Sequence, residues 1–297
     1  MASFRRSVSC LSQKASRNSP EEIALVERPT INGHVKLSES DQFGSVGFVD
    51  FWPLTVKKAV KASCATFEQF EVLVERANEW LEENDDFELI NCESLDKKVI
   101  YVADVYSQSL IYADEDANTH AVHIIGLRLW YCKRLSSNDT KNDRLQLDFI
   151  DILPFYLNPG EKEPRFESVS STVDRINATL RHTPLQGRIL SIVSVNLTLA
   201  EDIWASGAQI NTCQTRWFDE FNTHNLIFIR IFFLVGPPCH ELIGLKDFSP
   251  RIIKSGNVFQ PAQYSTISEL VSMIQDWIRM VGGNNVCCFF FTYLHLF

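Results

Sequence analysis

Apolar residues recur at helical spacing in three stretches of the chain. In each stretch they stand at positions i, i+3, i+7, i+10 and i+14, which places five apolar side chains along one face of a helix. The three sets align without a gap: Phe67, Phe70, Val74, Ala77 and Leu81; Phe166, Val169, Val173, Ile176 and Leu180; Tyr264, Ile267, Val271, Ile274 and Ile278. The pattern predicts amphipathic helices over residues 67–81, 166–180 and 264–278, each packed on a sheet.

Polar residues mark fixed places on these helices. Thr66 and Gln69 fit a capping box, in which Thr66 accepts from a backbone amide of the first turn and Gln69 reaches back. Asn78 and Asn177 match between the first two helices, and Gln275 stands at that place in the third. The sequence therefore predicts that the first helix begins directly after Thr66.

An Asp-x-x-Pro tetrapeptide precedes each helix, at residues 50–53, 151–154 and 247–250. Apolar and polar residues alternate over Leu145–Phe149, ahead of the second copy, and Leu242–Phe248 resembles a strand less clearly. Proline has no N–H to give to a strand ladder, and aspartate can bond the amides of a turn. Each tetrapeptide therefore predicts a corner at which a strand ends.

Strand-like runs follow the first two helices. Residues 88–95 match residues 188–195, and residues 122–131 match residues 225–235. Short turns between consecutive strands favour antiparallel pairing. The predicted fold is α+β: a tandem repeat of units of about 100 residues, each an antiparallel sheet with one helix packed on a face.

The repeat also predicts where the units lie. A disordered tail over residues 1–33 is expected to precede unit one at 34–135, unit two at 144–236 and a truncated unit three at 240–297. Residues 289–297 have no counterpart in the earlier copies, so the chain is expected to be a fragment or a variant with a replaced C-terminus. An unfinished sheet would leave an apolar helix face and a strand edge uncovered.

Charge narrows the possible partners. The net charge is −9, and residues 1–20 carry four basic side chains and no acidic one, so the rest of the chain is strongly acidic. Such a surface repels a phosphate backbone, and nucleic acid is therefore not expected as a partner. No apolar run approaches the ~20 residues of a membrane-spanning helix, so no membrane role is expected either.

Cysteine usage bears on the cellular compartment. The eight cysteines form no CxxC motif, and no long apolar core of a secretory signal is present, which indicates an intracellular and most simply a cytoplasmic protein. The Ser/Arg-rich N-terminus also fits a mitochondrial transit peptide, so that location stays open.

Candidate chemistry is sparse. No glycine-rich phosphate loop is present, and no cofactor is expected. Cys92 or Cys213 could form a nucleophilic pair with His120 or His224. His120 and His123 lie three residues apart, but the second copy has no counterpart of His123, so no metal site is expected.

A repeated arginine is the most informative polar residue. Arg128 and Arg230 each stand within an apolar strand, where an arginine either stacks on an aromatic ring or pairs with a carboxylate. Asp50 and Asp151 are the repeated acidic residues, so an ion pair is predicted within each unit. The alternative is an arginine that extends to solvent from a sheet edge.

Two functions are compatible with this sequence. Framework positions repeat without a repeated catalytic set, which favours a non-enzymatic interaction or scaffold protein whose partner is a protein. The alternative is an enzyme or small-ligand binder with its site in a cleft between units. Its candidate residues are Cys92, His120, His123, His224 and Arg128. The oligomeric state is left open.

Overall fold

The computed structural model describes residues 31–34, 46–57, 66–99, 121–134, 145–158, 161, 165–200, 210–219, 223–246, 248–256 and 260–281. Within these residues the fold is mixed α+β, with antiparallel strands arranged in several sheets and with helices packed against them. The predicted α+β class is therefore confirmed.

The first sheet is antiparallel and has the strand order β1-β2-β6-β5, with β9 added beside β6. Its strands are β1 (Ile31–His34), β2 (Val46–Phe51), β5 (Phe87–Val99), β6 (Ala121–Lys133) and β9 (Arg216–Asp219). Asp50 of β2 lies opposite Arg128 of β6, and Phe48 lies opposite Trp130. These even-numbered residues share one face of the sheet, because successive side chains of a strand alternate.

The second sheet has the order β7-β10-β8, and its strands are β7 (Leu147–Ile152), β8 (Leu185–Ala200) and β10 (Thr223–Cys239). Asp151 of β7 lies opposite Arg230 of β10, and Phe149 lies opposite Phe232. β6 in the first sheet thus lies between β2 and β5, as β10 in the second sheet lies between β7 and β8.

Two short hairpins precede helices. They pair β3 (Thr55–Lys57) with β4 (Thr66–Phe67) and β11 (Ile252–Lys254) with β12 (Gln263–Tyr264). An isolated bridge between Tyr156 and Phe166 stands at the corresponding place before the second helix.

The helices are α1 (Phe70–Glu83), α2 (Val169–His182) and α4 (Ile267–Val281). Each begins three residues after the first residue of its predicted stretch. The reason is that the first apolar residue of each set, such as Phe67, is extended and pairs with a residue that follows the corner. The predicted starts were therefore wrong in the same way at all three places.

The predicted capping box at Thr66 is also wrong, because Thr66 belongs to β4 and the N-cap of α1 is Gln69, which makes no side-chain cap bond. A capping box does form at α4. There the Thr266 hydroxyl accepts from the Glu269 N–H, and a Glu269 carboxylate oxygen accepts from the Thr266 N–H.

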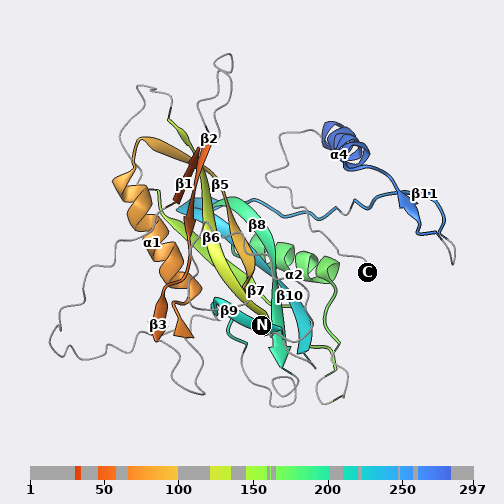
Figure 1. Ribbon diagram of the computed structural model, residues 1–297. Helices are drawn as coiled ribbons and strands as arrows, with labels where there is room; N and C mark the ends of the chain where they lie inside the picture. The colour runs from red at the N-terminus through yellow and green to blue at the C-terminus, as the bar shows by residue number, and fades with distance from the viewer. Residues whose placement is uncertain are drawn as a thin grey trace.

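Helix α1 packs against both sheets, while α2 packs on the other face of the second sheet. Buried α1 residues share one core cluster with Leu127 and Leu129 of β6 and with Phe228 and Phe232 of β10. Buried α2 residues cluster instead with the alternate residues of β10. Figure 1 shows α1 and α2 on opposite sides of the strands, with α4 and β11 standing apart from them.

Three predicted boundaries need correction. Strand β1 pairs with β2, so residues 31–33 are not part of a disordered tail. Strand β10 continues to Cys239 because its last residue pairs with Leu185, three residues past the predicted end of unit two at 236. Residues 242–246 and 248 lie in no strand, since none of the described residues supplies a partner ladder for them.

Candidate functional site

Two arginine–aspartate pairs link neighbouring strands. Arg128 donates from Nε to Asp50 Oδ1 at 2.6 Å and from Nη2 to Oδ2 at 2.8 Å. Arg230 makes the same two bonds to Asp151, at 2.7 and 2.8 Å. Both pairs are bidentate, which gives strong and geometrically specific bonds. These are the two ion pairs that the repeated arginine and aspartate residues predict.

The second pair is buried beneath α1, Ser94 of β5 and the segment that carries Thr212. The Arg230 guanidinium lies 3.7 Å from the centre of the Phe70 ring and 4.8 Å from that of Phe149, and its side chain is 1% exposed. It also donates to the Thr212 carbonyl at 3.0 Å. A buried arginine with this set of partners serves packing and leaves no open group for a substrate.

The first pair lies on the matching face of the first sheet, which no helix of the described chain covers. The Arg128 side chain is 24% exposed. Its guanidinium carbon lies 4.3 Å from the centre of the Phe48 ring and 5.4 Å from the centre of the Trp130 ring. Trp130 Nε1 donates to Glu93 at 2.9 Å. The bond to Asp50 raises the pKa of Arg128, so the guanidinium stays charged. We call Phe48, Asp50, Glu93, Arg128 and Trp130 the outer arginine face.

An asparagine on each of the first two helices bonds to the backbone of a distant segment: Asn78 of α1 bonds to the first residue of β7, and Asn177 of α2 bonds to the segment after β10. Asn78 Nδ2 donates to the Leu147 carbonyl at 2.9 Å, and the Leu147 N–H donates to Asn78 Oδ1 at 2.7 Å. Asn177 makes the same two bonds to Ile243, at 2.7 and 2.8 Å. Each amide thus satisfies one donor and one acceptor of a backbone.

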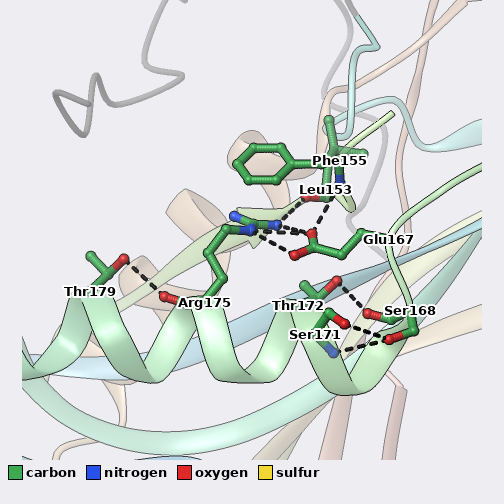
Figure 2. A network of polar contacts seen from close by, with 8 residues as sticks. All are labelled: Leu153, Phe155, Glu167, Ser168, Ser171, Thr172, Arg175 and Thr179. Carbon is green, nitrogen blue, oxygen red and sulfur yellow. Dashed lines mark hydrogen bonds and ion pairs between the residues drawn. The ribbon is translucent and has the colours of Figure 1, made fainter. Parts of the chain in front are cut away.

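Each of the first two corners carries an arginine–glutamate network (Figure 2 shows the second). Arg175 Nη2 donates to the Leu153 carbonyl and to Glu167 Oε2, both at 2.8 Å, and Glu167 Oε2 accepts from the Phe155 N–H at 3.1 Å. Burial alone would raise the pKa of Glu167, but the bonds from Arg175 and Phe155 outweigh it and lower that pKa.

The first corner repeats the arrangement with other residues. Arg76 Nη1 donates to the Trp52 carbonyl and to Glu68 Oε2, which also accepts from the Leu54 N–H. Sequence analysis did not single out these residues, although the equal spacing of eight between Glu68 and Arg76 and between Glu167 and Arg175 was a usable signal. At the third corner a serine stands in place of the glutamate: the Ser265 N–H donates to the Arg251 carbonyl, and the Ser265 hydroxyl accepts from the Arg251 N–H at 2.9 Å.

Several apolar side chains of α2, of the segment after β10 and of α4 are exposed. Val169 of α2 stands where α1 has Phe70, and it is 42% exposed whereas Phe70 is fully buried. Leu242, Leu245 and Ile267 are exposed as well, although Ile243 between the first two is buried against α2. These exposed side chains come from α2, from the segment after β10 and from α4, and they are candidates for contact with a partner.

The candidate catalytic residues do not form one site among the described residues. Cys92 is buried in the core opposite Leu129, whereas His123 lies six residues away along β6, which corresponds to about 20 Å. His123 Nδ1 lies 2.9 Å from Asp96 Oδ1. His224 is near the start of β10, opposite Leu199, and His120 lies outside the described residues.

The surroundings of Cys213 disfavour its thiolate. Burial, together with the carboxylate of Glu71, raises the pKa of its thiol well above the ordinary range. The thiolate is the reactive form of cysteine, so this environment does not favour a nucleophilic role for Cys213. Within the described ranges, no group of three or more His, Cys, Asp or Glu residues is arranged to hold a metal ion. None of the helices described there has the length and apolar character to cross a membrane.

Comparison with known proteins adds no function. Protein-family models, curated proteins and solved structures yield no match to this chain.

Proposed function

We propose that the chain is a non-enzymatic protein-interaction scaffold built as a tandem repeat of α+β units. Three sets of matched contacts support the repeat: the arginine–aspartate pairs, the asparagine bonds to the next backbone, and the corner networks. In this arrangement α1 and α2 each pack on a sheet, and an asparagine of each helix bonds to the first segment of the next unit. The third unit begins at Ile243, which Asn177 holds.

The observation that carries the proposal is the exposure of Val169. Its equivalent, Phe70, is fully buried between α1 and the second sheet, whereas Val169 is 42% exposed on α2. In stacked repeats each unit covers its neighbour, and terminal units need a polar outer surface to stay in solution. An apolar position left open at the end of the stack therefore fits a partner protein.

The alternative, an enzyme or ligand site in a cleft between units, has less support. Cys92 and His123 are too far apart to act on one ligand, and Arg230 is enclosed by Phe70, Asp151 and Phe149.

The test compares proteins that co-purify with the full chain and with two matched variants. Val169→Asp places a charge on the open surface, and Val56→Asp places the same charge on an exposed residue of β3, at the first corner. We expect a stoichiometric partner to be lost from Val169→Asp and kept by Val56→Asp. Equal recovery from both variants, or recovery of a tightly bound small molecule in place of a protein, would contradict the proposal.

A further inference from the structure

Within this chain, one arginine face is already covered by a helix. Helix α1 lies on the face of the second sheet that carries Phe149, Asp151, Arg230 and Phe232, and Phe70 lies over the Arg230 guanidinium at 3.7 Å. This arrangement shows which kind of element fits an arginine face in this fold. It is an amphipathic helix with a large apolar residue in its first turn.

The outer arginine face of the first sheet has the same construction. Asp50 and Arg128 are cross-strand partners as Asp151 and Arg230 are, and the aromatic pair Phe48–Trp130 replaces Phe149–Phe232. In both sheets this face is turned away from the helix of the same unit, because the alternate residues of β6 and β10 pack on α1 and α2 respectively. The outer arginine face therefore matches, residue by residue, the face of the second sheet on which α1 packs.

Glu93 is the main polar difference, since it lies beside Arg128 where the second sheet has Val193 beside Arg230. Its carboxylate accepts from Trp130 Nε1 at 2.9 Å and lies 3.9 Å from Arg128 Nη1. Glu93 therefore has a hydrogen-bond donor on its own face, while Asp50, Glu93 and Arg128 together leave this face with one negative charge more than the second sheet has at the matching place.

Helix α4 is the matching element. Counting from the corner prolines, its Ile267 stands at the place of Phe70, Gln275 at that of Asn78 and Trp277 at that of Trp80. Trp277 packs edge-on against Phe248 at 5.7 Å, so this side of α4 meets its own unit. Ile267 is 61% exposed and Gln275 is also exposed. Figure 1 shows α4 apart from both sheets.

We propose that α4 of one copy of this chain docks on the outer arginine face of a second copy, head to tail. Ile267 packs on the Arg128 guanidinium, and the Gln275 amide reaches the backbone at Val46, the counterpart of Leu147. This docking rests on the proposed scaffold function, and it identifies the partner protein as a second copy of the chain. The two surfaces differ, so the contact is heterologous and each copy keeps one surface of each kind for further copies.

The experiment is sedimentation velocity on the full chain over a concentration series. The α4 variants are Ile267→Asp and Gln275→Arg, and the face variant is Asn91→Arg, whose residue lies opposite Trp130. The wild type is expected to sediment faster as concentration rises, while each variant alone stays monomeric. An equimolar mixture of one α4 variant with Asn91→Arg should form a dimer and nothing larger, because one intact contact remains.

Leu157→Asp is the control and should assemble like the wild type. Coincident unfolding transitions of all variants establish that loss of assembly is not loss of folding. A wild type that stays monomeric throughout, or a mixture that stays monomeric, overturns the head-to-tail contact. If a different protein still binds the wild type and is lost from Val169→Asp, the scaffold function stands while the self-association fails.

Discussion

Asn78 holds Leu147 by both of its backbone polar groups, with the Asn78 Nδ2 donor 2.9 Å from the carbonyl oxygen and the Leu147 N–H 2.7 Å from Oδ1. The primary amide here takes the place of a neighbouring strand, because it offers one donor and one acceptor at backbone spacing. A single side chain of α1 thus fixes where the second sheet begins. Asn177 does the same for Ile243.

Replacing Asn78 is expected to weaken the junction between the sheets. Asn78→Ala leaves the N–H and the carbonyl of buried Leu147 without these partners, which costs about 1–3 kcal/mol for each buried group left unsatisfied. The free energy of unfolding from urea titration should fall by that order, and the Leu147 amide should exchange faster with deuterium. Asn78→Asp should show a similar loss, because a carboxylate cannot donate to the carbonyl.

Asn177→Ala is the matched comparison. We expect a smaller change in global unfolding, because the described residues after Ile243 form only the two-stranded β11–β12 sheet, whereas Leu147 begins a strand of the three-stranded second sheet. Faster amide exchange should be confined to residues near Ile243. If the two alanine variants lost equal stability, the two junctions would be equally coupled to global folding and the distinction would be wrong.

The two arginine–aspartate pairs should differ in their contribution to stability. Arg230→Ala leaves Asp151 buried without its cation and is expected to cost about 3–5 kcal/mol. Arg128→Ala should cost less, about 1–2 kcal/mol, because solvent reaches the 24% exposed Arg128 site. Guanidinium chloride unfolding of both variants measures the difference.

A double replacement separates the pair from its packing. Arg230→Met combined with Asp151→Leu removes both charges and keeps apolar volume, so most of the stability lost in Arg230→Ala should return. A double variant as unstable as Arg230→Ala would show that the remaining contacts of Arg230, such as its bond to the Thr212 carbonyl, are the larger contribution.

Much of the fold could be predicted from sequence, for identifiable reasons. An arginine in an apolar strand needs a partner, and Asp50 and Asp151 were the repeated acidic residues. The helix starts could not be predicted from periodicity, because Phe67 is buried as a strand residue and continues the apolar stripe without being helical. The asparagines were visible as matched positions. Their role depends on which backbone lies beside each helix, which only the tertiary structure shows.

Acid is expected to weaken the second corner. The pKa of Glu167 is lowered in the folded state, so its contribution is fully present above its unfolded value of about 4.3 and is lost as pH falls through the folded pKa. Arg175→Met removes the bonds that lower this pKa and should cost about 1–3 kcal/mol at neutral pH. The difference in unfolding free energy between wild type and Arg175→Met should therefore shrink below about pH 4.

Arg181→Met is the control for that experiment, since Arg181 is exposed on the same helix. It should leave the acid dependence of the wild type in place. A gap between wild type and Arg175→Met that stayed constant from pH 7 to pH 3 would show that Arg175 acts through its stacking on Phe155 and its bond to Leu153, and not through Glu167.

Alkali is expected to destabilise the chain through Cys213. Its folded pKa is raised by burial and by Glu71, so the thiol stays protonated in the folded state and ionises first in the unfolded state. The unfolding free energy should therefore fall as pH rises above about 8.5, by at most about 1.4 kcal/mol per pH unit from this one group. Cys213→Ala should reduce that slope, as measured by urea unfolding between pH 7 and pH 10.

The burial of Cys213 also predicts that its thiol is alkylated slowly in the folded chain. Iodoacetamide at pH 8 should modify this thiol far more slowly in the folded chain than in urea, because the thiolate is the reacting form. Peptide mass spectrometry resolves it from the other cysteines, and Cys239→Ala controls for removal of a thiol elsewhere. Rapid alkylation of Cys213 in the folded chain would mean that the thiol ionises readily there, and it would return Cys213 to the candidates for nucleophilic catalysis.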